Sequence, residues 1–256
     1  MNSVNNNPAI EFKQVFKSFG AQEVLKGVDA VLPRDKVNVI IGRSGGGKSV
    51  LLKHIIGLLR PDSGRVLVQG RDIVGLKERQ LSEVRRGFGM LFQEAALFDS
   101  LTVFENVVFP LIEHTKKSRK ELKEIVEGKL ASVGLKDMGY KMPSELSGGM
   151  RKRVGLARAL ALDPRIVLFD EPTSGLDPVM SAAINELIVR TKEEFNATCV
   201  VISHDIQAAM NTADNIFMLY EGRIIAEGDP QTIANWDDPV VHQFIHGQAQ
   251  GPIKVN

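Results

Sequence analysis

Cysteine, tryptophan and tyrosine are scarce in this sequence, which has one cysteine, one tryptophan and two tyrosines. The single cysteine, Cys199, excludes an internal disulfide and favours a reducing compartment. It lies in an apolar run at residues 197–202. We therefore expect Cys199 to be a buried strand residue.

Long hydrophobic runs are also absent. No stretch approaches the roughly 18 uninterrupted apolar residues of a membrane span. Residues 1–8 are polar and asparagine-rich, without the apolar segment of a signal peptide. We expect the chain to stay in the cytosol, so that any role at a membrane comes through a partner that crosses it.

An excess of charge of either sign is missing as well, since 32 basic and 31 acidic residues leave a formal net charge of +1. This balance gives no reason to expect nucleic acid or an anionic membrane surface as the main partner. The 256 residues, 43% of them hydrophobic, suffice for one large domain or for a domain with an inserted lobe.

The patterns that are present predict an α/β core. A helical pattern begins at Gly47, directly after a β-like run, and this strand, loop and helix order is typical of a nucleotide site. Two later apolar runs lack alternation and are typical of parallel strands buried on both faces, with a helix crossing between them. The β-like runs are residues 10–15, 24–32, 37–41, 65–69, 166–169 and 198–202, and the crossing helix is 178–195.

The periodicity turns helical between residues 102 and 133, with a charge-rich stretch at 116–129. We expect a helical lobe inserted between the two halves of the core. From Asp229 onward, one weak helix and an end interrupted by glycine and proline predict a loosely held extension. The predicted limits are 8–93 and 164–228 for the core, 94–163 for the lobe and 229–256 for the extension.

A phosphate-binding loop is the strongest local signal. The pattern G-x-x-x-x-G-K-[ST] occurs between a predicted buried strand and a helix, as such a loop requires. Its glycines allow backbone N–H groups to converge on phosphates, while the lysine reaches the β/γ phosphates and the serine hydroxyl binds Mg²⁺. This phosphate loop consists of Gly42, Arg43, Ser44, Gly45, Gly46, Gly47, Lys48 and Ser49.

Two carboxylates follow the apolar run that ends at Phe169. Asp170 is placed to be the second ligand of a magnesium ion at the end of a buried strand. Glu171, one residue further, can polarise the attacking water as a general base. Alone, such an Asp-Glu pair is more often a loop with two solvated acids, but the phosphate loop favours the catalytic interpretation.

The residues Leu146-Ser147-Gly148-Gly149-Met150, the signature segment, make the chain resemble the nucleotide-binding subunit of an ABC transporter over nearly its whole length. The resemblance implies a P-loop NTPase (RecA-like) core with an antiparallel β subdomain and an inserted helical subdomain. It also implies that Ser147, Gly148 and Gly149 present a helix N-terminus to the γ-phosphate of ATP held by the opposite subunit. Ser147 as a simple helix cap is compatible with this role.

Further positions match the family one at a time. Gln93 resembles the glutamine that touches Mg²⁺ and water and links the core to the lobe. His204 resembles the histidine that hydrogen-bonds the γ-phosphate, although a single His after a strand is more often structural. Asp177 resembles the D-loop residue at the dimer interface, with capping of the helix that starts at Pro178 as its alternative role.

The family also stacks an aromatic ring on adenine, and Phe19 matches that position. Phe16 is the competing candidate. Alternation with a period of two would place Phe12 and Phe16 on one face of the strand as core residues, which favours Phe19 as the stacking residue.

Met150 departs from the family pattern, which usually has glutamine there, and we expect ATP binding at the signature segment to survive. With residues 47–58 and the tail at 244–252, it makes the chain resemble the ATPases of Mce/Mla-type lipid transporters. These energise phospholipid traffic between the two membranes of a Gram-negative envelope. The implied place is the cytoplasmic face of the inner membrane, and the implied partners are permease subunits, an Mce-domain lipid-binding protein and a small accessory subunit, without nucleic acid.

The mechanism implied is a head-to-tail homodimer that holds two ATP molecules between the phosphate loop of one chain and the signature segment of the other. A groove near Gln93 would receive a helix of the permease. The candidate groove residues, whose default role is lobe core, are Phe98, Leu101, Val103 and Phe104. Alternatives are another ABC importer or exporter, or a soluble ABC ATPase acting on DNA or ribosomes. That last class usually has a long coiled-coil insertion or two nucleotide domains, and neither is present in the sequence.

Overall fold

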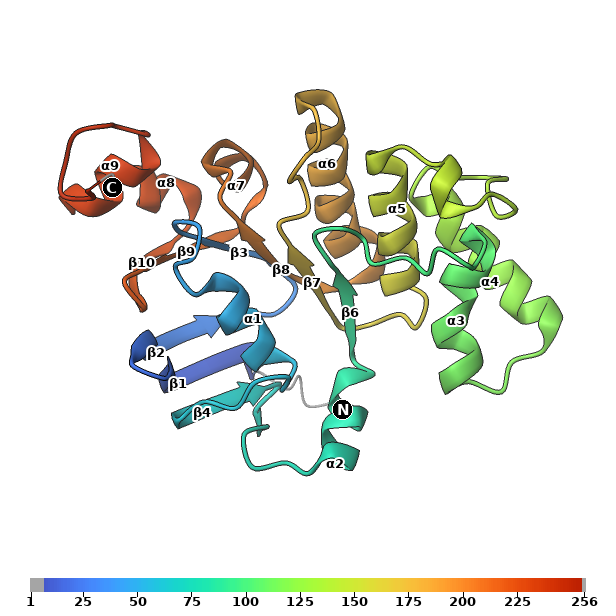
Figure 1. Cartoon of the computed structure of the whole chain (residues 1–256), viewed down its shortest axis with the longest axis horizontal. Coiled ribbons are helices and arrows are strands. Elements are labelled where there is room, and N and C mark those ends of the chain that lie inside the picture. The colour runs from blue at the N-terminus through green and yellow to red at the C-terminus, as the bar shows by residue number, and fades with distance from the viewer. Residues whose placement is uncertain (1–6, 255–256) are drawn as a thin grey trace, which may run out of the picture. The chain divides into compact units, whose positions relative to one another are not determined.

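A computed structural model of the chain describes residues 7–254. It consists of two compact units (Figure 1). The first unit comprises the chain up to Ser82 together with Val200 onward, and the second comprises Glu83–Cys199. The sequence-based limits of core, lobe and extension stay a prediction.

The first unit contains a four-stranded sheet in the order β2-β1-β4-β5, in which each strand pairs antiparallel with its neighbour. The register of β1 against β2 shifts between Phe12 and Val15, and again between Val15 and Phe16. Such bulges break the alternation of faces along a strand. The strands are β1 (Ile10–Phe19), β2 (Gln22–Leu32), β4 (Ser63–Val68) and β5 (Arg71–Asp72).

The first unit also contains further strands that pair in both directions, and one of them leads directly into the phosphate loop. Strand β3 (Val37–Ile41) is buried throughout and pairs in parallel with β9 (Asn215–Tyr220), which pairs antiparallel with β10 (Arg223–Gly228). Helix α1 (Lys48–Ile55) follows β3 after the loop, as the sequence predicts. A strand that is buried throughout and apolar except for Asn38, such as β3, is typical of a layer covered on both faces.

The C-terminal extension is better held than the sequence predicts. It forms two short helices, α8 (Pro230–Ala234) and α9 (Pro239–Ile245), where we expected one. The Gln243 side chain is 4% exposed; its amide donates to the carbonyls of Gln248 and Ile253, and its oxygen accepts from the Ile253 N–H. The expectation of a loose tail is therefore wrong up to residue 254, because one buried amide fastens it.

The second unit pairs β6 (Phe88–Leu91) in parallel with β7 (Ile166–Asp170) and adds the predicted helices. Capping boxes at Thr102 with Glu105, and at Ser118 with Glu121, explain where α3 and α4 begin. The helices are α3 (Val103–His114), α4 (Arg119–Ser132), α5 (Gly148–Ala159) and α6 (Pro178–Phe195), with a 3₁₀ turn at Pro143–Glu145.

Two elements carry the chain across the division between the units. Helix α2 (Glu78–Arg85) leads into the second unit, and strand β8 (Thr198–Ser203) leads back into the first. All residues of β8 are buried, among them Cys199, which forms no disulfide, as predicted. Helix α7 (Ile206–Thr212) follows β8 and packs on β3.

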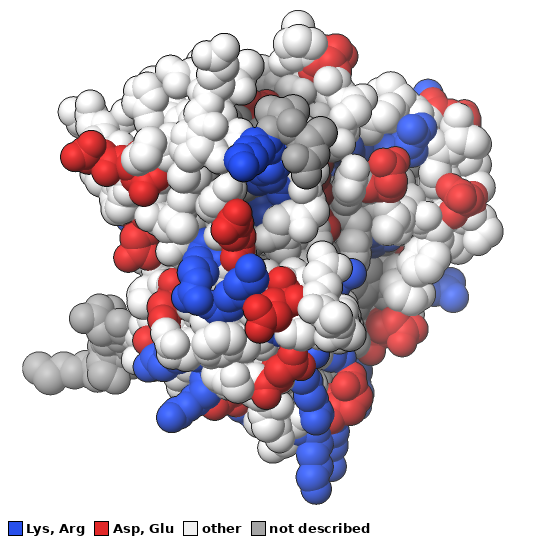
Figure 2. All heavy atoms as spheres, turned by 60° about the vertical axis from the view of Figure 1, so that its left-hand side comes forward, with Lys and Arg blue, Asp and Glu red and all other residues white. Residues whose placement is uncertain are grey.

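The surface carries both signs of charge. Figure 2 shows Lys and Arg side chains next to Asp and Glu side chains over the face that it draws, in keeping with the formal net charge of +1. Within residues 7–254, no helix combines the length and the apolar character needed to cross a membrane.

Candidate functional site

The phosphate loop lies between β3 and α1 and depends on glycine for steric reasons. Gly42 has a φ of 154°, and a Cβ there would clash with the carbonyl oxygen of Leu219 on β9. Gly47 has a φ of 97°, and a Cβ there would lie 3.1 Å from Cγ1 of Val24 on β2. Both positions combine a left-handed backbone with a close neighbour, so only glycine fits them.

Lys48 is held against the loop that precedes it. Its side chain is 5% exposed, and Nζ donates to the carbonyl oxygens of Gly42 at 2.8 Å and Arg43 at 3.1 Å. Helix α1 starts after Gly47 and so has no side-chain cap at its N-terminus. A lysine ammonium beside an uncapped helix N-terminus is a suitable site for phosphate.

Phe19, at the end of β1, is 47% exposed and therefore accessible for stacking. The Lys17 ammonium lies 5.5 Å from the centroid of its ring. Phe12 is 1% exposed, as predicted, but the prediction that Phe16 is core is wrong, because Phe16 is 39% exposed. The bulges of β1 remove the assumed alternation between the two residues, and the Phe16 ring covers Gly27 instead.

Asp62 anchors the segment that carries Phe19. Its carboxylate accepts from Lys17 Nζ at 2.7 Å and from the Ser18 N–H at 2.6 Å, and its own N–H donates to the Phe16 carbonyl at 2.9 Å. The hydrogen bond from Lys17 and that from the Ser18 backbone lower the pKa of this carboxyl. The sequence contains no signal for this anchor.

The two predicted carboxylates lie at the carboxyl end of β7. Both are half-buried. Glu171 has a φ of 48°, a left-handed conformation that is strained for a residue other than glycine. The Ser174 N–H donates to the Glu171 carbonyl at 3.1 Å and closes a turn. Strain of this kind clusters at functional sites, which fits a catalytic role for Glu171.

Gln93 and Asp177 border the same turn. The exposed Gln93 side chain donates from Nε2 to Ser174 Oγ at 3.3 Å. The Asp177 carboxylate accepts from the N–H groups of Val179 and Met180 and caps α6, so its predicted capping role is confirmed. We call residues 171–177, which end at this cap, the catalytic loop.

The signature segment starts α5. Ser147 is the N-cap and accepts from the Met150 N–H at 3.3 Å, as expected. Gly149 is buried, and a Cβ there would clash with Cε of Met180 on α6. Lys152, one turn further along, is 6% exposed and donates to the carbonyls of Pro172 and Ser174. The signature glycine thus packs directly on the start of α6.

His204 lies in the first unit directly after β8 and is exposed. The neighbouring Asp205 caps α7 through the Ala208 N–H. The predicted site residues thus fall into two groups by unit. The first unit holds Phe19, the phosphate loop and His204, and the second holds Gln93, Ser147, Gly148, Gly149, Asp170, Glu171 and Asp177. Their roles toward nucleotide and metal stay predictions.

The residues fit ATP with Mg²⁺. The phosphate loop offers backbone that only glycine permits, and Ser49 and Asp170 offer the oxygen ligands that Mg²⁺ prefers. Residues 7–254 contain no group of three or more His, Cys, Asp or Glu side chains suited to a metal ion. Mg²⁺ usually takes only one or two carboxylates and completes its shell with water and substrate phosphates, so this is compatible with it.

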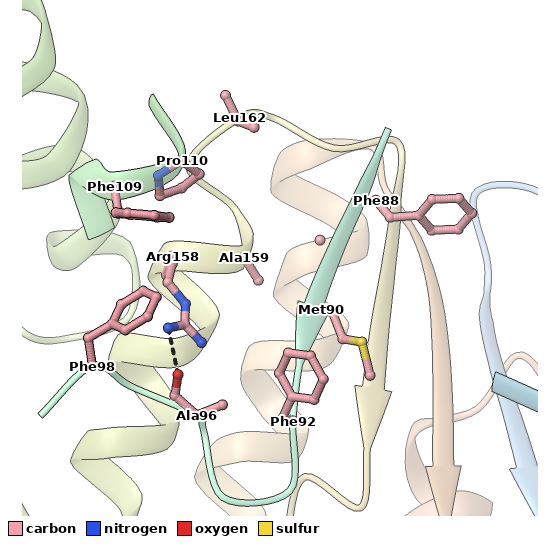
Figure 3. Close-up of a pocket in the computed structure, with 11 residues that line it drawn as sticks. Phe88, Met90, Phe92, Ala96, Phe98, Phe109, Pro110, Arg158, Ala159 and Leu162 are labelled. Carbon is pink, nitrogen blue, oxygen red and sulfur yellow. Dashed lines mark hydrogen bonds between the residues drawn. The ribbon is translucent and has the colours of Figure 1, made fainter. Parts of the chain in front are cut away.

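A cavity of about 350 Å³ opens in the second unit between β6, α3 and α5. Its apolar wall includes Phe98 and Phe109, whose ring centroids lie 5.1 Å apart, beside the Arg158 side chain (Figure 3). Arg158 donates to the carbonyls of Ala95 and Ala96, and burial lowers the pKa of its guanidinium. We call this the apolar groove, lined by Phe88, Gly89, Met90, Phe92, Ala96, Phe98, Phe109, Pro110, Arg158, Ala159 and Leu162.

The candidate groove residues separate in the structure. Phe98 is 44% exposed and lines the apolar groove, whereas Val103 is fully buried and belongs to the lobe core. Leu101 is half-buried, and Phe104 lines a different cavity, beside α4. Sequence reasoning missed Phe109 and Arg158. Phe109 is 42% exposed and is not one of the buried residues of α3, so helical periodicity gave no signal for it.

Comparison with known proteins places these features in one family. The sequence family described as ABC transporter matches residues 25–174. The chain is 46% identical over 245 residues to a probable ribonucleotide transport ATP-binding protein, mkl, of Mycobacterium leprae, covering 96% of this chain and 71% of that protein. It is 41% identical over 249 residues to the intermembrane phospholipid transport system ATP-binding protein MlaF of Haemophilus influenzae, covering 97% and 94%.

Solved structures agree. The chain superposes on cbiO1 of Clostridium perfringens, part of the ABC transporter complex cbiONQ, with a TM-score of 0.83 at 30% identity, covering 89% of this chain and 90% of that one. It superposes on a dimeric ATP-binding cassette in a post-hydrolysis state bound to ADP and Pi with a TM-score of 0.79 at 33% identity, covering 86% and 98%.

Proposed function

Because this chain belongs to the ABC transporter family, we propose that it is the subunit whose ATP hydrolysis energises phospholipid transport by a membrane complex. The observation that carries the proposal is the 41% identity to the phospholipid transport ATP-binding protein of Haemophilus influenzae, which extends over 97% of this chain and 94% of that protein. The protein of the same name from Escherichia coli K12 is 39% identical over 95% of this chain. Alignment over almost the full length of both chains favours a shared role.

The working unit we propose is a head-to-tail homodimer. Each ATP lies between the phosphate loop of one copy and the signature segment of the other, where Ser147 and the N-terminus of α5 face the γ-phosphate. The dimeric solved cassette that holds ADP and Pi supports this assembly. A single copy then lacks half of each site, so it hydrolyses ATP slowly.

Within each site, the proposed catalysis depends mainly on charge and hydrogen bonds. Lys48 exchanges its carbonyl acceptors on Gly42 and Arg43 for phosphate oxygens. Glu171 takes the proton of the attacking water, while Gln93 and His204 orient water and γ-phosphate. Ser49 and Asp170 would hold Mg²⁺, which neutralises charge on the phosphates. Hydrolysis replaces attraction across the dimer with a repelling ADP and phosphate pair, and the dimer reopens.

The apolar groove would receive a helix of the permease. Exposed aromatic rings around a cavity are typical of sites that anchor an apolar helix face. Changing Phe109 to Asp would place a charge in this groove and should prevent co-purification of the permease. Changing Ile112 to Asp is the matched control, because Ile112 is 58% exposed on the same helix and does not line the groove. Loss of the permease in both variants, or in neither, would contradict the assignment.

The remaining partners and the location complete the proposal. We place the chain at the cytoplasmic face of the inner membrane, attached through the permease. An Mce-domain lipid-binding protein and a small accessory subunit are proposed as further members of the complex, and nucleic acid is not. The near-neutral net charge supports the last point.

Ribonucleotide transport is the second candidate, since the relatives with that name are 46% identical. The substrate is not expected to touch this subunit, so the chain itself does not separate the two. The chemistry of the molecule that co-purifies with the complex would.

The experiment is ATP hydrolysis by the complex obtained when the chain is co-expressed with its genomic neighbours. The native chain is compared with Glu171→Gln and Lys48→Ala, and with Lys53→Ala as the matched control, because Lys53 is exposed on the same helix. We expect both site variants to lose hydrolysis while Glu171→Gln alone still traps a dimer with ATP. Full activity of the isolated chain without any membrane protein would overturn the proposal.

A further inference from the structure

Lys152 is a buried cation that has no role in the mechanism proposed above. It follows the signature segment on α5, and its residue is 6% exposed. A lysine is rarely buried unless its ammonium has partners that compensate for lost hydration. Its partners therefore indicate why this position carries a charge.

The partners are backbone carbonyls of the catalytic loop. Lys152 Nζ donates to the Pro172 carbonyl at 2.8 Å and to the Ser174 carbonyl at 2.6 Å. These carbonyls belong to the turn that starts at Glu171. Burial lowers the pKa of Lys152, while the negative charges of Glu94 and Glu171 act against that shift. One ammonium thus holds two carbonyls of the turn next to the candidate base.

Two further contacts lie on the same side of α5. Gly148 has the Leu176 side chain 3.7 Å from the position a Cβ would occupy, and Gly149 is packed against Met180. Positions 148 and 152 are four residues apart and so share a face of the helix. The start of α5 therefore contacts the catalytic loop at Gly148 and Lys152, and the start of α6 at Gly149.

The turn that Lys152 holds is strained. Glu171 has a φ of 48°, and a backbone in this region persists only where its surroundings fix it. The hydrogen bonds from Lys152 fall on the carbonyls of Pro172 and Ser174, one and three residues after Glu171. Gln93 adds a weaker bond to the Ser174 hydroxyl, at 3.3 Å.

We propose that Lys152 is a positioning residue that couples the signature helix to the catalytic loop of the same chain. When ATP held by the opposite subunit binds the signature segment, Lys152 transmits this contact to the catalytic loop. The contact thereby sets the position of Glu171 and Asp177 in the subunit that carries Lys152. The inference rests on the proposed head-to-tail dimer. It makes hydrolysis at the two sites interdependent without any direct contact of Lys152 with nucleotide.

The test is steady-state hydrolysis by the full co-expressed complex as a function of ATP concentration, for the native chain and for Lys152→Met. Methionine keeps the length and apolar stem but has no donor. We expect kcat to fall on the order of 100-fold, as for displacement of a reacting group by about 1 Å, and the Hill coefficient to fall toward one. The affinity of the purified chain for a fluorescent ATP analogue should stay within about twofold, because the phosphate loop is unchanged.

Two more variants separate positioning from mere stability. Lys152→Arg keeps the charge and the donors, and should recover at least part of kcat. Lys129→Met is the matched control, because Lys129 is 8% exposed in the same unit and pairs with Asp163 instead. It should lower the melting temperature but leave the Hill coefficient unchanged. If Lys152→Met fails to fold, Lys152→Gln, which retains an amide donor, serves in its place.

The outcomes are distinct. An inactive native complex would refute the proposed function and not this inference alone. A native complex that hydrolyses ATP cooperatively, together with Lys152 variants that match its kcat and Hill coefficient, would overturn the role of Lys152. The same would follow if kcat fell only in proportion to the loss of folded protein, as in Lys129→Met.

Discussion

The phosphate loop in the first unit and the signature helix with its catalytic loop in the second unit are built in different ways. In the phosphate loop Gly42 faces backbone, the carbonyl of Leu219, whereas in the second region Gly149 faces a side chain, the end of Met180. Both regions contain a buried lysine that binds carbonyls, but Lys48 binds its own loop and Lys152 binds a loop 20 residues away. Backbone cannot yield without refolding, whereas side chains can change rotamer.

This difference suits the two roles. A phosphate loop that binds the same phosphates in every cycle benefits from rigidity, because a preorganised site needs no free energy for rearrangement. A region that must respond to nucleotide in another subunit needs an element that can move. We therefore expect substitutions in the phosphate loop to abolish nucleotide binding. Substitutions in the second region should lower hydrolysis in a way that a second substitution nearby can restore.

The largest effect should come from Gly42→Ala. The added Cβ would clash with the carbonyl oxygen of Leu219. That oxygen cannot shift because β9 is paired with β3, so the phosphate loop should be distorted and nucleotide binding should be lost. The measurement is binding of a fluorescent ATP analogue, with thermal unfolding alongside. The control is Gly247→Ala, which also has a positive φ of 60° but nothing within 4 Å of a Cβ. Gly247→Ala should cost about 1 kcal/mol and leave binding intact.

Gly149→Ala should have a large effect on hydrolysis that a second substitution can restore. The added methyl group meets Met180 Cε, the flexible end of a side chain, and pushes α5 away from α6. Hydrolysis by the complex should fall, and Met180→Ala introduced in the same chain should restore most of it. If the double variant is no better than Gly149→Ala, the contact with Met180 is not the cause, and the contrast with Gly42 disappears.

Asp62→Asn should have a smaller effect, confined to nucleotide affinity. The amide cannot replace the paired acceptors for Lys17 and Ser18, so the segment that carries Phe19 loosens. We expect KM for ATP to rise by no more than about fivefold, since exposed ion pairs contribute little, with kcat unchanged. Glu11→Gln, which removes the surface pair with Lys13, is the control and should change neither parameter.

The smallest effect concerns acid stability. His54 on α1 is 1% exposed, and burial lowers its pKa from the usual 6.5, while Nδ1 donates to the Val50 carbonyl. The unfolded chain then binds a proton at a higher pH than the folded one. The free energy of unfolding should therefore decrease as the pH falls below about 6.5, by at most about 1.4 kcal/mol per pH unit.

His54→Gln should flatten this dependence between pH 7.5 and pH 5.5, measured by chemical denaturation. The exposed His114 provides the matched control, and His114→Gln should leave the dependence as it is. An unchanged slope in His54→Gln would show that another group carries the acid sensitivity.

The sequence predicted those features that depend on local order. The helix at 178–195 and its cap Asp177 were predicted to the residue, because a capping carboxylate before proline is a local signal. The burial of Cys199, and of the strand that contains it, followed from one apolar run. Prediction was wrong where one strand meets another, as at Phe16, whose exposure depends on bulges formed with β2.

The sequence by itself therefore determined the phosphate loop, the signature segment and the carboxylates after β7, but it did not predict strands β6, β9 and β10. Only the tertiary structure decided that Lys152 binds a loop 20 residues away, and that Asp62 holds a segment 44 residues before it. It also decided that Gln243 fastens the tail. The physical reason is the range of the interaction. Glycine, proline and capping residues act within one turn of their own backbone, whereas a buried polar group takes whichever partner the fold brings within about 3 Å.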